Sequence, residues 1–145
     1  MASPQEDEIR STLSGFLTKM YQDGRPNLVH AVLLGDHKPT NSDLGQNPEE
    51  YLEDNLIWPI LDALGVNFTK RPYQDTGSHG VWPDFRINNL QGKDLIGENK
   101  APNEFQSGVK EVSDYLDRRS IGADYGIATD EIGRASCRER VSSPV

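Results

Sequence analysis

The sequence contains a single cysteine, Cys137, and no apolar run long enough to span a membrane. One cysteine excludes both a disulfide framework and a cysteine-based zinc site within one chain. The N-terminus is acidic, whereas a secretory signal begins with basic residues followed by an apolar stretch. From these absences we expect a soluble, cytoplasmic protein that has no membrane partner.

Hydrophobic residues are also scarce, at 34% of the 145 residues, and the mean hydropathy is -0.68. They nevertheless cluster into periodic segments, which distinguishes the chain from a disordered one. The length suits one domain with a hydrophobic core and is too short for two domains of ordinary size. We therefore expect a folded domain with long polar loops.

Positive charge is limited, because 15 Lys and Arg stand against 23 Asp and Glu and the formal net charge is -8. A protein that binds nucleic-acid phosphates normally has a basic surface, so this balance argues against binding by bulk electrostatics. Two facts weaken that objection. Carboxylates that bind Mg²⁺ count as negative in the formal sum, and proteins that work in high salt also carry acidic surfaces.

Three familiar catalytic motifs are missing as well. The histidines, His30, His37 and His79, do not form the helical pair with an intervening glutamate that binds zinc in metalloproteases. Residues 77–80 lack the strand-turn-helix setting of a serine nucleophile elbow, and no glycine-rich phosphate loop ends in Lys-Ser or Lys-Thr. None of these three sites is therefore predicted.

The last fifteen residues differ in character from the rest of the chain. Residues 131–145 hold three Arg, two Glu and the only cysteine, whereas residues 1–130 hold 12 Lys and Arg against 21 Asp and Glu. This segment resembles translated vector or adaptor sequence, so we exclude it from the predicted fold as a non-native tail. The natural chain is expected to continue past Asp130.

Apolar residues at helical spacing predict three helices. They cover residues 4–22, residues 47–65 and the segment from Asn103 to Leu116. A capping signature opens the second helix, a glycine closes it, and Pro59 inside it predicts a kink. The apolar run at residues 28–34 fits either a helix or a strand.

Short apolar runs between and after these helices predict four strands, at residues 66–69, 82–87, 94–100 and 125–129. The first three can form a meander, with a turn at residues 88–92. The fourth follows a helix and can lie parallel to its predecessor. The pattern predicts an α/β fold with a mixed β-sheet flanked by helices.

Acidic residues and a lysine lie on two of these predicted strands. Asp84 follows a proline on one strand, and Glu98 and Lys100 end the next. Residues two apart on a strand share a face, so Glu98 and Lys100 point the same way and a hairpin can bring Asp84 beside them. Two carboxylates suit Mg²⁺, and a nearby lysine can orient or deprotonate a water. Alternatively, Asp84 ends a turn and the other two lie on a solvated edge strand.

This arrangement resembles the PD-(D/E)xK nuclease superfamily, which has the restriction-endonuclease-like fold. The resemblance lies in Pro83-Asp84 and Glu98-Asn99-Lys100, with a helix upstream and a helix-strand unit downstream. Within the superfamily, residues 56–65 and 125–130 look like parts of the nuclease domains of type I and type IIG restriction enzymes. The resemblance implies an N-terminal helical segment and loop at residues 1–46. It also implies a nuclease core at residues 47–130, incomplete at its C-terminus.

The resemblance also implies roles for these residues. Asp84 and Glu98 would hold Mg²⁺, the backbone carbonyl of Asn99 would add a ligand, and Lys100 would position the attacking water. Hydrolysis of a DNA phosphodiester bond would leave a 5'-phosphate and a 3'-hydroxyl. The lost C-terminal region would carry a methyltransferase, helicase or specificity function. The alternative is a non-catalytic DNA-binding or assembly module on the same fold.

Relatives in this superfamily add a glutamate at the start of the upstream helix. Glu49 is the best match, although an acidic residue in a first helical turn is favoured by the helix dipole whatever its chemistry. Glu50 and Glu53 remain alternatives for this upstream acid. The sequence also departs from the family, because many relatives have a Gln one helical turn before a Tyr on the downstream helix. Here Glu111 precedes Tyr115.

Overall fold

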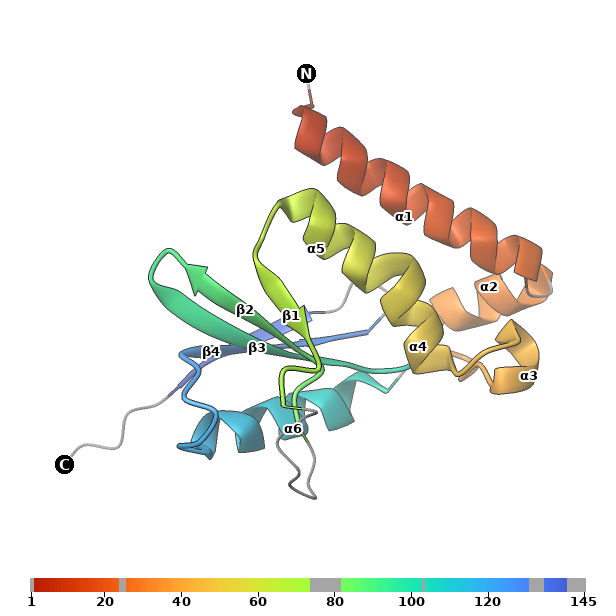
Figure 1. Cartoon of the computed structure of the whole chain (residues 1–145). Coiled ribbons are helices and arrows are strands. Elements are labelled where there is room, and N and C mark those ends of the chain that lie inside the picture. Colours follow the sequence, from red (N-terminus) through yellow and green to blue (C-terminus); the bar gives the residue numbers. More distant parts are fainter. Residues whose placement is uncertain (1, 24–25, 74–81, 103, 131–134, 141–145) are drawn as a thin grey trace. The chain divides into compact units, whose positions relative to one another are not determined.

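The computed structural model describes residues 2–23, 26–73, 82–102, 104–130 and 135–140. The chain forms two compact units. Unit 1 is helical, and unit 2 contains the β-sheet (Figure 1). Unit 1 consists of residues 1–66, 101–104 and 130–132, and unit 2 of residues 67–100, 105–129 and 133–145. The division at residues 46 and 130 that the sequence suggested stays a prediction.

Unit 1 begins with the predicted N-terminal helix, α1 (Pro4–Asp23), which opens with a proline and an acidic first turn. The ambiguous apolar run belongs to a helix, α2 (Pro26–Leu33). A single helical turn that the sequence analysis missed, α3 (Asn41–Leu44), comes next. Its signal is a capping box, in which the Thr40 amide donates to Asp43 Oδ2 at 2.8 Å.

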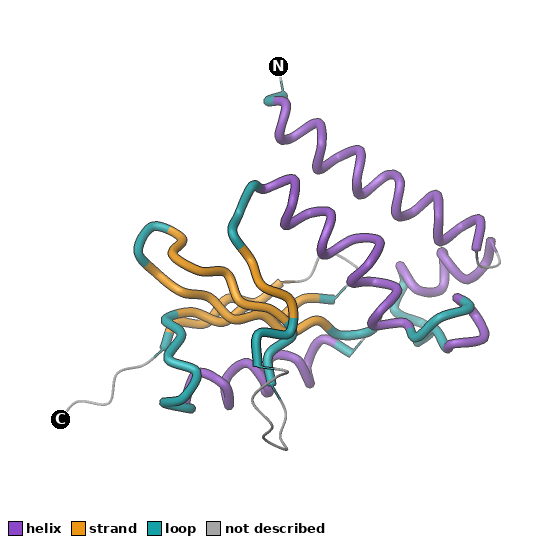
Figure 2. Tube along the Cα trace, in the orientation of Figure 1, coloured by secondary structure: helices purple, strands orange, loops and turns teal. Residues whose placement is uncertain are grey.

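The upstream helix runs continuously through α4 (Pro48–Leu52), a π-helical segment η1 (Glu53–Ile57) and α5 (Trp58–Leu64), as Figure 2 shows. The side chain of Asn47 caps it by accepting from the amides of the next turn, and Gly65 ends it with a φ of 70°. The predicted kink residue, Pro59, is the second residue after the π-helical segment. Proline has no N–H to donate, so it is compatible with a local change of hydrogen-bond spacing.

Unit 2 is built on a five-stranded mixed sheet in which the strands lie in chain order. Strands β1, β2 and β3 form an antiparallel meander, and helix α6 (Phe105–Asp117) leads to β4, which lies parallel to β3. The α/β class with a mixed sheet is confirmed. The strands are β1 (Phe68–Lys70), β2 (Phe85–Leu90), β3 (Lys93–Asn99), β4 (Tyr125–Thr129) and β5 (Ala135–Glu139).

Parts of unit 2 also differ from the expectation. Residues 135–139, which were excluded as part of a tail, form β5 and pair antiparallel with β4. The predicted turn at residues 88–92 is shorter, because β2 extends to Leu90 and the turn itself is Gln91-Gly92, both with positive φ. Asn103, the expected start of the third helix, lies outside the described residues, and α6 begins at Phe105.

Helix α6 packs on the sheet of unit 2 through contacts with β3 and β4 (Figure 1). A side chain at Gly126 on β4 would overlap with Val112, so this glycine lets the helix approach closely. The buried core comprises Ile96, Val112, Tyr115, Leu116, Ile121, Ala123 and Ala128. Within the part of the chain that the structure describes, no helix combines the length and apolar character needed to cross a membrane.

One half-buried arginine, Arg86, connects the loops of unit 2 to its sheet. The guanidinium of Arg86 donates to the hydroxyl of Tyr73, to the carbonyl of Ile121 and to the carboxylate of Asp94, each at 2.7 Å. Charge-assisted bonds of this length are stronger than neutral ones. Arg86 therefore helps to fix the segments on either side of the β2–β3 hairpin.

Candidate active site

Asp84 lies immediately before β2, and the β2–β3 pairing places it beside the end of β3. Its backbone N–H donates to the carbonyl of Gly97 at 2.9 Å, and its Oδ2 accepts from the Asn99 amide at 2.8 Å. The guanidinium of Arg71 is 3.5 Å from the other carboxylate oxygen. Asp84 is buried, and the backbone of the hairpin fixes the position of its carboxylate.

Glu98 and Lys100 share one face at the end of β3, as the strand periodicity predicted. The ammonium of Lys100 is 3.1 Å from Glu98 Oε1. Glu98 is buried, and among the described residues its second carboxylate oxygen, Oε2, has no hydrogen-bond partner. The sequence therefore identified three side chains that the fold of unit 2 brings to the same end of β3.

Two further side chains come from α6 and were missed as site residues. Glu111 Oε2 is 2.8 Å from the Lys100 ammonium, so Lys100 lies between two carboxylates. Tyr115, one helical turn later, is buried, and its pKa responds to the charge of Glu98. The signal in the sequence was the spacing of Glu111 and Tyr115 on the helix, which by itself indicated only a departure from the family pattern.

The close packing of acidic side chains shifts their pKa values. Burial raises the pKa of Asp84. Burial also raises the pKa of Glu98 to about 9, and the neighbouring Glu111 carboxylate and the charge of Asp84 add to the effect. Burial opposes ionisation of Glu111, but its contacts with Glu98 and Lys100 outweigh burial and lower its pKa. Without a cation, Glu98 therefore keeps a proton at neutral pH.

Lys100 and Tyr115 respond to the same surroundings. Burial by itself would lower the pKa of Lys100, but the contacts with Glu111 and Glu98 outweigh it and raise this pKa. Burial is the main reason why the pKa of Tyr115 is raised, and the charge of Glu98 adds to it. The lysine is therefore a cation and the tyrosine a neutral hydroxyl at physiological pH.

The residues at this end of β3 fit a hard divalent cation. Asp84 and Glu98 offer carboxylate oxygens, which Mg²⁺ prefers, and Glu98 Oε2 is a buried oxygen that lacks a partner among the described residues. The side chain of Asn99 already takes part in a hydrogen bond, in which its Oδ1 accepts from the hydroxyl of Thr129 at 3.0 Å. Its backbone carbonyl stays the predicted third ligand.

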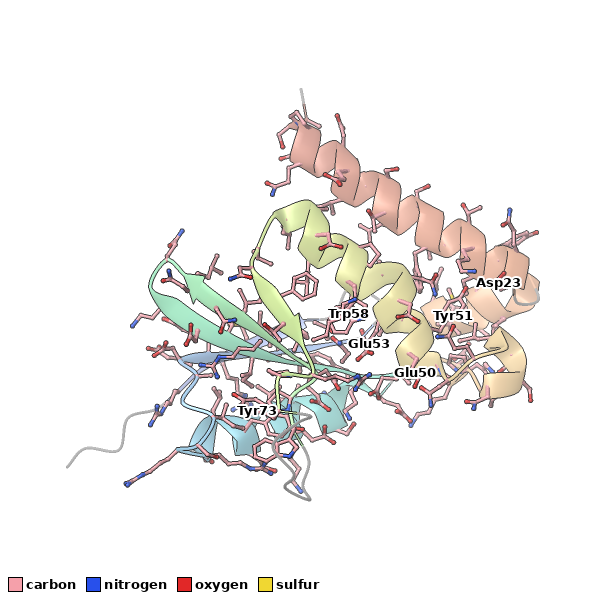
Figure 3. The ribbon with its side chains drawn as sticks, viewed as in Figure 1. Asp23, Glu50, Tyr51, Glu53, Trp58 and Tyr73 are labelled. Carbon is pink, nitrogen blue, oxygen red and sulfur yellow. The ribbon has the colours of Figure 1, made fainter. Side chains whose placement is uncertain are left out.

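The candidates for the upstream acid belong to unit 1. Glu49 is half-buried in the first turn of α4, Glu50 is exposed, and Glu53 is buried at 2% exposure. Figure 3 labels Glu50 and Glu53 on this helix. Carboxylate oxygens of Glu49 and Glu53 lie within 4.8 Å of each other. Within unit 1, burial distinguishes Glu53, which the sequence analysis offered only as an alternative. The role of Glu49 stays a prediction.

Comparison with known proteins relates the chain to a restriction enzyme. In an alignment of 91 positions that covers 59% of its length, the chain is 33% identical to the "Putative type II restriction enzyme and methyltransferase RM.MjaORFECS2P" of Methanocaldococcus jannaschii. The chain spans only 8% of the length of that relative. No family model matches the chain, and no solved structure matches it.

Proposed function

We propose that this chain is the nuclease part of a restriction-modification enzyme and that it hydrolyses DNA phosphodiester bonds with Mg²⁺. The observation that carries the proposal is the convergence of Asp84, Glu98 and Lys100 at one end of β3. The similarity to a protein named as a restriction enzyme and methyltransferase gives independent support.

Each of these side chains has a distinct part in the proposed reaction. Asp84 and Glu98 would hold Mg²⁺ together with the carbonyl of Asn99, and the bound ion would stabilise negative charge on the attacked phosphate. The Lys100 ammonium would donate a hydrogen bond to the attacking water and orient it. The water oxygen bonds to phosphorus and the bond to the 3' oxygen breaks. One proton of the attacking water would pass to solvent and the departing 3' oxygen would take one from solvent, so that the products are a 5'-phosphate and a 3'-hydroxyl.

The distribution of charge weakens the main objection to DNA as the substrate. Unit 1 carries 14 Asp and Glu against 4 Lys and Arg, whereas unit 2 carries 9 against 11. Without residues 133–145, unit 2 is balanced at eight of each. The net charge of -8 therefore arises in unit 1, and the unit that holds the candidate site is not acidic overall.

The proposal extends to parts that lie outside unit 2. An upstream acid, Glu49 or the more buried Glu53, would assist the reaction or hold a second metal ion. A methyltransferase, helicase or specificity region would complete the enzyme, in line with the two activities in the relative's name and the small share of its length that the chain spans.

A plasmid-nicking assay with Mg²⁺ tests the proposal. The wild-type chain should nick supercoiled DNA, and Lys100→Ala should lose at least about a hundred-fold in rate because the water is no longer oriented. Lys93→Ala, which removes an exposed lysine from the same strand, is the matched control and should behave as the wild type. Equal cleavage by wild type and Lys100→Ala would contradict the proposal. Metal-independent DNA binding without cleavage would instead favour the non-catalytic module.

A further inference from the structure

We propose that helix α6 is a positioning device for Lys100, in which Gly108 makes room for the lysine side chain and Glu111 holds its ammonium. This inference rests on the proposed function, because it assigns α6 a task in the same reaction. Both residues lie on α6, one helical turn apart, and both meet the same side chain of β3. Neither was identified as a site residue from the sequence.

Gly108 accommodates the aliphatic part of Lys100. A Cβ at this position would lie 2.9 Å from Lys100 Cγ and 3.9 Å from Lys100 Cε. Real Cβ atoms do not approach other atoms this closely, so a larger residue would displace the lysine side chain. Glycine inside a helix is unfavourable compared with alanine. The close approach of Lys100 explains why a buried glycine occupies the fourth position of this helix.

Glu111 holds the other end of the same side chain. Its Oε2 is 2.8 Å from the Lys100 ammonium, shorter than the 3.1 Å from that ammonium to Glu98 Oε1. The Lys100 side chain is only 14% exposed. This contact is an ion pair, and a carboxylate attracts an ammonium more strongly than the neutral amide oxygen of a glutamine would. The lysine is thus constrained at its stem and at its charged end.

The helix itself is well anchored, so it can define a position. Val112 packs over Gly126 of β4, and Tyr115 and Leu116 belong to the buried core together with Ile96 of β3. Positioning is most precise when the residues that support a reactive group lie on packed, rigid elements. Helix α6 meets that condition, because Gly108 and Glu111, which contact Lys100, lie on the same helix as residues buried against the sheet.

Glu111 matters most for the position of Lys100 when a divalent cation binds to Glu98. The Glu98 carboxylate would then be a ligand of the cation, and Lys100 would lose one of its two carboxylate partners. Glu111 is not among the proposed metal ligands and remains available to the ammonium at that stage. The geometry therefore assigns Glu111 the task of keeping Lys100 beside the carboxylates while the reaction proceeds.

Side-chain NMR relaxation tests this role independently of DNA cleavage. The order parameter of the Lys100 Cε methylene is measured in wild type and in Glu111→Ala, each with EDTA and with Mg²⁺. We expect about a two-fold loss of order in Glu111→Ala, largest with Mg²⁺. Asp114→Ala, which removes an exposed acid from the same helix, is the matched control and should retain the wild-type value. An unchanged order parameter in Glu111→Ala under both conditions would overturn the inference.

Cleavage kinetics provide the second readout. Glu111→Ala should lower kcat by roughly ten- to a hundred-fold with little change in KM, and Glu111→Gln should recover part of the loss because its amide oxygen can accept. Gly108→Ala should also lower kcat. Because alanine raises helix propensity, a weaker helix would not explain this loss. A rise in KM with unchanged kcat would overturn the inference. If the wild-type chain never cleaves DNA but Glu111→Ala still shows the loss of Lys100 order, only the proposed function is overturned.

Discussion

At the scale of single residues, the candidate site concentrates unfavourable interactions in Glu98. Its carboxyl group is buried, one of its oxygens has no hydrogen-bond partner among the described residues, and the acids Asp84 and Glu111 lie close to it. Such an arrangement destabilises a fold unless a cation offsets the negative charge. Functional sites commonly sacrifice stability in this way.

The raised pKa of Glu98 predicts how stability depends on pH in the absence of a cation. The folded chain keeps the proton until pH approaches about 9, whereas the unfolded chain loses it near 4.5. The folded state binds more protons between these values, so the free energy of unfolding should fall as pH rises through this window. Glu98→Gln removes this dependence and should stabilise the metal-free protein at pH 8 by about 1 to 3 kcal/mol.

Urea unfolding in EDTA at several pH values between 5 and 9 measures this effect. The wild type should lose stability towards pH 9, and the difference between Glu98→Gln and wild type should grow over the same range. Glu139→Gln, a change of the same kind at an exposed site on β5, is the control. A constant difference across the pH range would show that Glu98 does not hold a proton in the folded state.

The sequence located the strand residues of the site because they depend on short-range geometry. Strand periodicity put Glu98 and Lys100 on one face, and a hairpin needs only a local turn to bring Asp84 beside them. Glu111 and Tyr115 depend instead on how α6 is rotated about its axis after the crossover. Helical periodicity predicted the apolar stripe of that helix, but it does not reveal which neighbouring residues will face Lys100.

At the scale of elements, the β2–β3 hairpin depends on a close approach between Gly97 and Phe85. These residues are paired across the two strands, and a Cβ at Gly97 would overlap with the ring of Phe85. Phe85 and Gly97 directly adjoin Asp84 and Glu98 along the two strands. The packing of the aromatic ring therefore stabilises the part of the hairpin that carries the two carboxylates.

Substitution of Gly97 should therefore damage the hairpin. Gly97→Ala is expected to lower the free energy of unfolding by about 1 to 3 kcal/mol, because the overpacked ring must move. Gly15→Ala makes the same chemical change in the middle of α1, where nothing lies within 4 Å, and should stabilise the helix by roughly 0.5 to 1 kcal/mol. Thermal unfolding of the two variants measures these two changes in stability. A shift in the same direction for both would refute the packing explanation.

Elements with strong local signals were predicted well, and those without them were not. Asn47 and Gly65 delimit the upstream helix because capping chemistry is local. The short run at residues 28–34 was ambiguous because its length suits either a helix turn or a strand. β5 was missed because its sequence was set aside on composition, whereas its pairing depends on the free edge of β4.

At the scale of the whole molecule, charge is divided between the two units. Unit 1 holds the acidic excess, and unit 2 combines the candidate site with 11 of the 15 Lys and Arg residues. A net charge computed over the whole chain conceals this division, which is why it argued against a nucleic-acid substrate at the sequence level. Charge considered unit by unit is consistent with the similarity to a restriction enzyme.

The most direct test is the rate of plasmid nicking as a function of Mg²⁺ concentration, for the wild type and for Asp84→Asn. The substitution keeps the size of the side chain and removes the charge that would hold the ion. We predict that the wild-type rate rises with Mg²⁺ to a plateau and vanishes in EDTA, and that Asp84→Asn loses at least about a hundred-fold at every concentration. Nicking by the wild type in EDTA, or a wild-type Mg²⁺ response in Asp84→Asn, would contradict a metal-dependent nuclease site at the end of β3.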